Sequence, residues 1–339
     1  DAGDIVAIAG LDDIYVGETI CKEGLEEALP LIKVSEPTVQ MNFGTNTSPF
    51  AGKEGQFVTG RKIEERLFRE TQRDVSLRIN RVDNKEEWIV SGRGELHLSI
   101  LIENLRREGF EFQVSRPRVI LKEIDGVINE PYEYVQVDVP DEYIGSAIEM
   151  FGNRRGNLEG MNSKDGQTRL IYTIPSKGLI GFMTDFLTAT HGYGIINHTF
   201  LEYRPVQPDV FMGRKLGVLV SINQGMATTY ACGGVEDRGE LLIEPGIMVY
   251  EGMIVGICNR EEDLAVNITR EKQMTNQRSA TKDSTIVLKK PRVFSLENYL
   301  SFIDEDELVE VTPNSIRLRK MILDTVERKK YDSTKLKKH

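Results

Sequence analysis

Residues 91–114 read SGRGELHLSILIENLRREGFEFQV, and this stretch decides how the surrounding chain folds. Apolar residues recur at the spacing of one helical face, at Leu98, Leu101, Ile102 and Leu105. Gly109 ends this pattern, because glycine readily adopts the left-handed conformation found just after a helix. The stretch therefore predicts a glycine turn, a helix over about 95–108 and a strand over 110–114.

The residues before this stretch complete a βαββαβ order. Residues 38–43 alternate with a period of two, which is the pattern of a strand. A helix is predicted near 59–72, and two further strands over 76–82 and 88–91. Residues 34–118 are therefore predicted to form one split-βαβ, ferredoxin-like unit.

The following segment, residues 119–208, repeats this order. Strands are predicted over 132–139, 158–163, 168–174 and 195–203, with helices around 144–151 and 179–187. Asp141 is placed to cap the first helix, and Asp165-Gly166 is a strong turn pair. The fold class is therefore α+β with two ferredoxin-like units. We expect each unit to have a core of its own, although this fold says little about function.

The two ends of the chain have a different character. Residues 209–339 combine short β-rich runs with a helix starting at Ser295 and a basic tail; the runs lie at 216–222, 253–258 and 285–288. Residues 1–33 carry a strand-like apolar run at 5–9, which indicates the end of a β-barrel that cannot bury a core alone. We therefore expect a chain that begins inside a longer protein.

Composition excludes several functional classes. The net charge of −10 argues weakly against nucleic-acid binding, although a basic stripe can lie on an acidic protein. The cysteines lack metal-ligand spacing, which predicts buried thiols in a cytosolic protein; they are Cys21, Cys232 and Cys258. No apolar run could span a membrane, and no secretory signal is recognised.

No catalytic residue or metal site is predicted. Residues 55–62, GQFVTGRK, have the glycine spacing of a P-loop, but Arg61 and Lys62 stand where Lys and Ser or Thr are needed. The turn Gly92-Arg93-Gly94 lacks the third glycine of a dinucleotide fingerprint. We interpret His97 as a structural residue beside that turn. The sequence therefore predicts that this chain neither binds nor hydrolyses GTP.

Two stretches resemble known domains of the elongation factor G family. GRGELHL at 92–98 is similar to the third domain of that family, and the similarity continues to Glu111. Arg154-Arg155-Gly156 and residues 181–192 are similar to its fifth domain. The fourth domain of that family is absent between the two units. The last 130 or so residues resemble the C-terminal region of the BipA/TypA family of translational GTPases, at 278–280, 302–313 and 316–320.

This resemblance covers essentially the whole chain and implies its organisation. Residues 1–33 would end a second-domain barrel, 34–118 would be domain III-like, 119–208 domain V-like and 209–339 a BipA-type C-terminal domain. The GTPase domain would be missing, and GTP and Mg would bind there, leaving no cofactor in this chain. The resemblance implies a cytoplasmic monomer that binds the ribosome in stress response or ribosome assembly, with no membrane or small-molecule substrate.

The basic stretch 270–292 is the leading candidate for contact with RNA. Phosphate binding uses cations and short polar donors, and this stretch supplies Arg270, Lys272, Asn276, Arg278, Lys282, Lys289 and Lys290. The residues alone favour a solvated loop. The resemblance implies that a loop of the C-terminal domain contacts ribosomal RNA at the A site on the large ribosomal particle, with A-site tRNA as a further candidate partner.

A second candidate for RNA contact is the pair Arg154 and Arg155. These arginines either match charge at a helix C-terminus capped by Gly156 or contact ribosomal RNA, and the sequence leaves both readings open.

Two other functions of the whole chain also remain. One is that the chain is an RNA-binding fragment of a different translation factor, such as elongation factor 4. Residues 209–339 would distinguish that factor from the BipA/TypA family. The other is a small-molecule-binding regulatory module, because paired ferredoxin-like units often bind metabolites.

Overall fold

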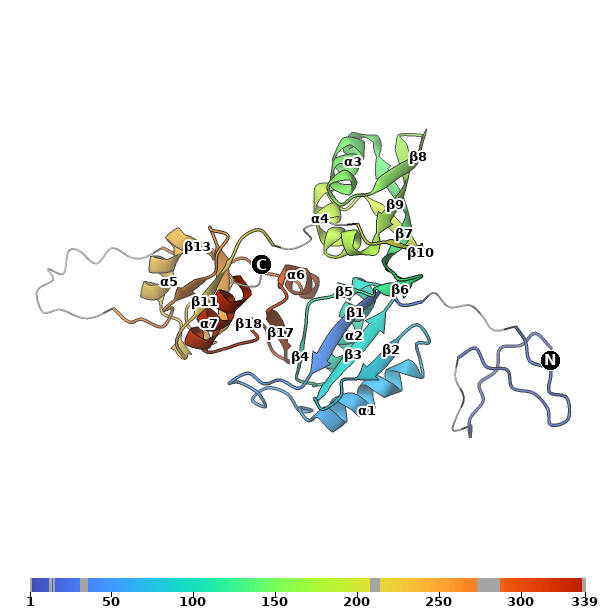
Figure 1. Cartoon of the computed structure of the whole chain (residues 1–339), viewed down its shortest axis with the longest axis horizontal. Coiled ribbons are helices and arrows are strands. Elements are labelled where there is room, and N and C mark those ends of the chain that lie inside the picture. The colour runs from blue at the N-terminus through green and yellow to red at the C-terminus, as the bar shows by residue number, and fades with distance from the viewer. Residues whose placement is uncertain are drawn as a thin grey trace, which may run out of the picture.

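A computed structural model describes residues 2–11, 14, 16–30, 36–207, 214–272 and 287–336. Two ferredoxin-like units are followed by a β-rich domain with helices (Figure 1). This arrangement confirms the predicted α+β class. Within the described ranges, no helix is both long and apolar enough to cross a bilayer.

The first unit has four antiparallel strands in the order β4-β1-β3-β2. Its elements are β1 Val39–Gly44, α1 Gly60–Thr71, β2 Arg78–Arg81, β3 Glu87–Gly92, α2 Glu95–Arg107 and β4 Phe112–Val114. The apolar stripe of α2 and two residues of α1, Ile63 and Leu67, are buried against the sheet residues Phe43, Trp88 and Val90. The helical spacing in the sequence therefore marks the face of each helix that makes this core.

The second unit repeats this topology in the order β10-β7-β9-β8. Its elements are β7 Val127–Pro140, η1 Asp141–Tyr143, α3 Ile144–Asn153, β8 Asn157–Lys164, β9 Gln167–Pro175, η2 Ser176–Leu179, α4 Phe182–Ala189 and β10 Ile195–Pro205. Asp165 and Gly166 both have positive φ, as the predicted tight hairpin requires. The predicted capping role of Asp141 is wrong: this residue lies in η1, and its carboxylate accepts a hydrogen bond from Thr168.

The C-terminal domain is β-rich, with short helices. Its elements are β11 Val218–Ser221, β12 Gly225–Met226, α5 Thr229–Val235, η3 Glu236–Arg238, β13 Gly239–Leu241, β14 Met248–Val249, β15 Met253–Cys258, β16 Leu264–Val266, α6 Leu296–Phe302, β17 Glu307–Val311, β18 Ile316–Lys320 and α7 Thr325–Leu336. Ser295 starts α6 with a capping box to Asn298, as its position predicts. The strand expected over 285–288 falls partly outside the described residues, and Val287 and Leu288 form none.

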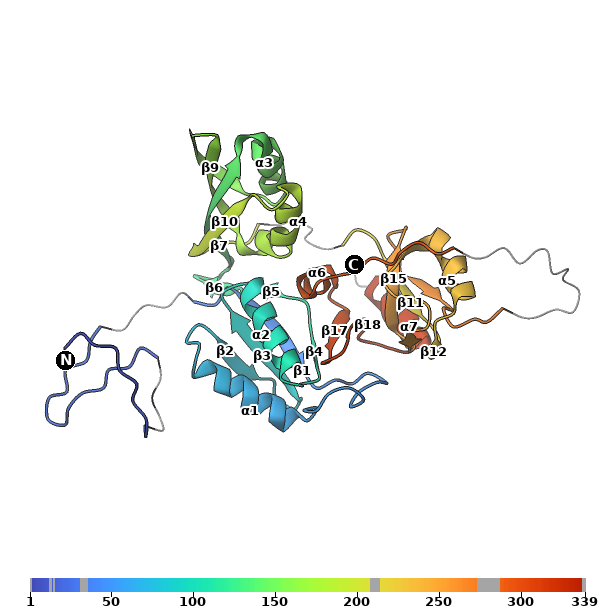
Figure 2. The ribbon, with the colours of Figure 1, turned by 180° about the vertical axis from the view of Figure 1, so that it is seen from behind.

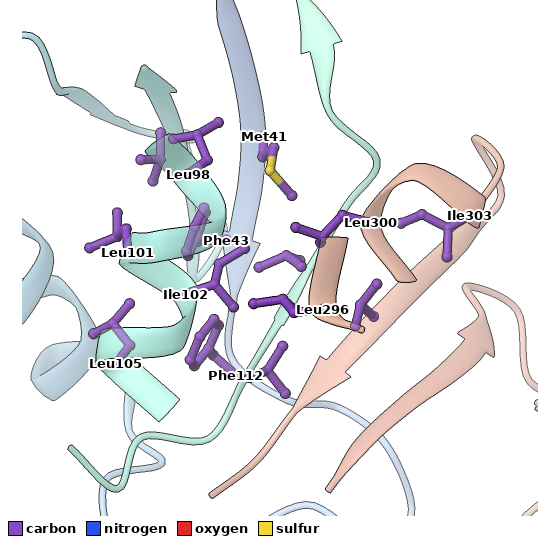
Figure 3. Close-up of a cluster of buried hydrophobic side chains, with 14 of the residues drawn as sticks. Met41, Phe43, Leu98, Leu101, Ile102, Leu105, Phe112, Leu296, Leu300 and Ile303 are labelled. Carbon is purple, nitrogen blue, oxygen red and sulfur yellow. The ribbon is translucent and has the colours of Figure 1, made fainter. Parts of the chain in front are cut away.

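One sheet of eleven strands joins the first unit to the C-terminal domain. Strand β17 pairs antiparallel with β4, with Val309 opposite Val114 and Val311 opposite Phe112. Figure 3 shows apolar side chains of α6 and β17 continuing the core formed by α2 and β1. The expectation that the first unit has a core of its own is therefore wrong, because residues of α6, β17 and β18 complete it.

Buried charges lie along the same seam. The Glu310 side chain is fully buried and accepts hydrogen bonds from Tyr250 Oη at 2.7 Å, Ser48 Oγ at 2.9 Å and Arg317 Nη1 at 3.1 Å. Ser48 belongs to the first unit and the other two donors belong to the C-terminal domain. Because a buried carboxylate needs several partners, this network fixes how the two parts of the sheet meet.

The second unit has a separate core and a short connection to the first. Strand β5, Arg118–Val119, pairs with β1, whereas β6, Lys122–Ile124, pairs with β7. The buried cluster of the second unit contains residues of that unit alone. Seen from behind, the described part of the second unit lies beside the first unit and α6 at one of its ends (Figure 2).

The described residues near the N-terminus form no helix and no strand beyond a single bridge between Lys22 and Leu25. The strand expected at 5–9 is wrong, and Ile5 and Val6 are exposed, because so short a segment cannot bury a core. Cys232 and Cys258 are buried thiols, as predicted, whereas Cys21 is only partly buried.

Candidate nucleic-acid interface

The described ends of the basic stretch lie on the C-terminal domain beside α5 and η3. β16 runs parallel to β11 and leads to Arg270, whose side chain is exposed with its guanidinium 5.9 Å from the Tyr230 ring centroid. Lys272 is also exposed. Three of the predicted RNA-binding residues lie outside the described residues: Asn276, Arg278 and Lys282.

Arg270 shares a hollow of about 420 Å³ with an arginine that the sequence alone did not single out. Arg238 of η3 lines this hollow with Tyr230 and Asn267, and no carboxylate lines it among the residues that the structure describes. Thr228 fixes the arrangement: its hydroxyl caps α5 by accepting from the Ala231 amide at 3.1 Å and donates to the Arg270 carbonyl. The hollow thus presents two cations, an aromatic ring and an amide.

Lys289 and Lys290 lie at the other end of η3. Both side chains are exposed and line a second hollow of about 300 Å³, together with Glu236 and Glu240. The Lys289 amide donates to Glu236 Oε1 at 2.7 Å, which holds the returning chain against η3. The fold therefore brings cations from both ends of 270–290 to one short segment, although the second hollow also contains acidic groups.

Arg154 and Arg155 have different roles in the second unit. Arg154 donates from Nη1 to the carbonyl of Ile180 at 2.9 Å and lies over the Phe182 ring, so its side chain ties α3 to the start of α4. Arg155 is exposed and has a φ of 61°. The expectation that Gly156 provides the cap is therefore corrected: Arg155 takes the left-handed position, and the Gly156 amide bonds to the Phe151 carbonyl at 2.8 Å.

Arg155→Gly is expected to stabilise the protein by up to about 1 kcal/mol, because the left-handed conformation costs a residue with a Cβ about 1–2 kcal/mol and glycine loses part of that gain as entropy. Thermal and urea unfolding of the full chain would measure the change. Asn153→Gly, inside the same helix, is the matched control and should destabilise. A variant of Arg155 that melts below the parent would show that its side chain has a stabilising role.

The glycine-rich segment at 55–62 binds its own carboxylate. The amides of Gly52 and Gly55 donate to Glu111 at 2.7 and 2.8 Å, and Glu111 is fully buried. A Cβ at Gly55 would come within 2.3 Å of the Glu111 Cβ. The amides of Gln56 and Phe57 donate to the Gly109 carbonyl, so the first three amides of the segment bond within the protein, and Glu111 explains why glycine stands at position 55.

His97 has the structural role that its position suggests. Its Nδ1 accepts from the Arg93 amide at 3.3 Å, and its Nε2 lies 2.6 Å from the Asp74 carboxylate. These contacts fix the glycine turn that begins α2. Among the described side chains, no group of three His, Cys, Asp or Glu residues could hold a metal ion.

Three family models match successive parts of the chain. Elongation Factor G, domain III, matches residues 58–116, and the Elongation factor G C-terminus matches residues 127–213. The TypA/BipA C-terminal domain matches residues 216–325, which decides between the translation factors considered above. A crystal structure of a Thermus thermophilus protein is 16% identical, covers 53% of this chain and 42% of that chain, and has a TM-score of 0.35, a likeness too weak to support a conclusion.

Curated relatives match nearly the whole chain. The large ribosomal subunit assembly factor BipA of Bacillus subtilis is 57% identical over 330 residues, which are 97% of this chain and 54% of that protein. The proteins of the same name from Synechocystis and Haemophilus influenzae are 52% and 51% identical, over 94% and 98% of this chain and 54% of each relative. This chain therefore spans about half the length of the curated relatives that it matches. It belongs to the BipA/TypA family of elongation factor G-like proteins.

Proposed function

We propose that this chain acts in the assembly of the large ribosomal subunit, to which it binds. One observation carries this proposal. Relatives that are 50–57% identical over almost all of this chain are named large ribosomal subunit assembly factor. We further propose that the whole protein is a cytoplasmic monomer that hydrolyses GTP with Mg in a domain outside these residues. The contribution of this chain would be affinity and placement.

The surface proposed to contact ribosomal RNA lies around α5 and η3. We name it the η3 surface and define it by Arg238, Arg270, Lys272, Lys289 and Lys290. Three of its properties support the proposal: its described cations are exposed, one of its hollows has no carboxylate among its described lining residues, and Tyr230 offers a ring on which a base can stack. A-site tRNA is a second candidate ligand of this surface, because its phosphates have the same chemistry.

Removing two cations of the η3 surface is expected to weaken binding to large ribosomal subunits and to flatten its salt dependence. Each phosphate contact contributes a log–log salt slope of about −0.7 to −0.9, so Arg238→Ala with Arg270→Ala should reduce the slope by about 1.5. The measurement is cosedimentation of the full chain with purified large subunits over a series of salt concentrations. Melting curves should stay nearly unchanged, because exposed charges rarely alter stability by more than about 0.5 kcal/mol.

The matched control removes two exposed cations from α1, Arg61 and Lys62, which pair with Glu65. This control should keep the slope of the parent protein. An unchanged slope in the η3-surface variant, with native melting, would contradict the assignment of the surface. Absence of binding by the parent chain at low salt would contradict the proposed function of the chain itself.

A further inference from the structure

The hollow of about 420 Å³ beside α5 has an apolar floor and a polar rim. We call it the α5 hollow. Its floor is formed by three buried apolar residues, Ala231, Val235 and Val266. Its rim is formed by four exposed side chains, Tyr230, Arg238, Asn267 and Arg270. An apolar surface beside cations and an amide suits a flat base that carries a phosphate.

The polar groups of this rim are accessible and have hydrogen-bond capacity left over. The Arg238 side chain is exposed and pairs with no carboxylate among the described residues. Asn267 is also exposed, and its Oδ1 accepts from the amide and the hydroxyl of Thr269, both at 3.1 Å. Its Nδ2 therefore remains available as a donor. Because guanidinium and amide N–H groups need acceptors, the rim favours a ligand with acceptor atoms such as phosphate oxygens.

The ring of Tyr230 can take part in stacking. Tyr230 is 37% exposed, and the Arg270 guanidinium lies 5.9 Å from the ring centroid. A base stacked on the ring would lie about 3.4 Å from it, and a guanidinium on the other face of the base would lie at about twice that distance, about 6.8 Å. An outward movement of at least roughly 1 Å by the exposed Arg270 side chain would therefore enclose a base between the two groups.

Two glycines keep the α5 hollow open. Helix α5 has only seven residues, and Gly233 and Gly234 lie in its last turn, where glycine is less favourable than alanine. At Gly234 the φ lies outside the left-handed region, and an added Cβ would meet no described atom within 4 Å. A longer side chain at this position, which lines the α5 hollow, would fill space that a ligand needs. The protein would tolerate such a side chain, whereas a bound ligand would not.

We propose that the α5 hollow receives one unpaired nucleotide of RNA. The base would stack on Tyr230 beside Gly233 and Gly234, and the phosphate would bind Arg238. Bases inside a duplex are stacked and paired, whereas the face of an unpaired base is free to enter a hollow. This inference rests on the proposed contact of the η3 surface with RNA, and it adds that the RNA is single-stranded at this point.

A fluorescently labelled strand of six uridines tests the proposal, and an abasic strand of equal length and charge is its match. Anisotropy with the full chain at low salt should show the uridine strand binding at least about fivefold more tightly, because stacking of one base on an aromatic ring changes affinity by about 5–150-fold. Uridine monophosphate should bind at least about tenfold more weakly than the strand, since it lacks the neighbouring phosphates that the η3 surface would contact.

Changes within the α5 hollow should act on the base alone. Tyr230→Ala should weaken binding of the uridine strand by about 5–150-fold, and Tyr230→Phe, which keeps the ring, should bind like the parent. Gly234→Leu should also weaken binding by at least about fivefold, yet raise the melting temperature, because leucine favours a helix more than glycine does. Stacking releases no counterions, so the salt slope should stay that of the parent, unlike the slope of the Arg238 and Arg270 variant.

The matched control is Gly145→Leu on α3, where an added Cβ likewise meets no described atom within 4 Å. It should raise the melting temperature and bind the uridine strand like the parent.

Three results would overturn the proposal: equal binding of the uridine and abasic strands, unchanged binding by Tyr230→Ala and Gly234→Leu, or no binding of the uridine strand at concentrations up to roughly 1 mM. Binding of uridine monophosphate as tight as that of the strand would also overturn it, in favour of a site for a free nucleotide. Cosedimentation of the parent chain with large subunits tests the proposed function separately, so the two failures are distinguishable.

Discussion

A chain that ends after Gln207 is expected to have an unfolded first unit and a folded second unit. The shortened chain would lose β17, which pairs with β4, and the buried side chains Leu300, Ile303 and Val309. Burial of one such side chain contributes about 1.5–3 kcal/mol, so the loss over the whole seam approaches the total stability of about 5–15 kcal/mol of a typical domain. The second unit should persist, because its buried cluster is its own.

Tryptophan fluorescence shows whether the first unit of the shortened chain is folded or unfolded. Trp88 is the only tryptophan of the chain and is 1% exposed in the first unit, so its emission reports on that unit alone. The shortened chain should show solvent-exposed emission while far-ultraviolet circular dichroism still melts cooperatively. In the full chain, Leu300→Ala should cost about 2–5 kcal/mol, and the exposed control Leu201→Ala should cost little. A native Trp88 emission after truncation would show that the first unit folds without the C-terminal domain.

Glu307→Gln is expected to destabilise the full chain by about 3 kcal/mol, at the low end of the range for breaking a buried ion pair. The Glu307 side chain is fully buried and accepts from both Nη atoms of Arg214 and from Lys320 Nζ, each at 2.8 Å. Glutamine keeps the size of the side chain but removes the charge. Asp263 and Asp306 also contact Lys320, so that cation keeps part of its compensation.

The effect of this change should fade in acid. Burial raises the pKa of Glu307, but hydrogen bonds and charges from Arg214 and Lys320 outweigh burial and hold the pKa below its usual value. A depressed folded-state pKa means that the stabilisation is present above the unfolded pKa of about 4.3 and is lost as the pH falls further. Urea unfolding at about pH 7 should therefore separate parent and variant, and the two should converge in strong acid.

Glu65→Gln is the control for this comparison, because Glu65 forms exposed pairs with Arg61 and Lys62 on α1. Exposed pairs contribute little, so this variant should unfold like the parent. If Glu307→Gln also unfolded like the parent at neutral pH, the buried charges would not stabilise the seam. A gap between parent and variant that persisted unchanged in acid would point to packing rather than charge.

Local spacing predicted the parts of the fold that depend on near neighbours. The stripe from Leu98 to Leu105 placed α2 within a residue of its observed end, and Asp165-Gly166 placed the hairpin. The joined sheet could not be predicted this way, because β4 and β17 lie far apart in the chain. The sequence of neither strand indicates which strand it pairs with. Glu307 and Glu310 carry charges that are typical of a surface, and their burial is explained by partners far away in the chain, Arg214 for Glu307 and Tyr250 for Glu310.

The candidate sites show the same division. The clustering of basic residues in the sequence identified Arg270, Lys289 and Lys290 as candidates for RNA contact. It gave no signal for Arg238, which the fold of α5 and η3 brings to the same region. For Arg154 and Arg155 the sequence carried no signal for what the structure adds, which is the contact of Arg154 with Ile180 and the positive φ of Arg155; contact with RNA stays a prediction. Glu95 was predicted as the first residue of a helix, and nothing in the sequence indicated that its carboxylate accepts from the Gly181 amide of the second unit.

The eleven-stranded sheet sets the order of events when this protein is made. Strand β4 leaves the ribosome about 190 residues before its neighbour β17. At synthesis rates of about 5–20 residues per second, the first unit waits roughly 10–40 s with an open strand edge and an incomplete core. Meanwhile the second unit, which emerges later, can fold before the first unit is finished. During that interval the nascent chain exposes an unpaired strand edge that can pair with other chains and aggregate. A chaperone that covers β4 would prevent this pairing.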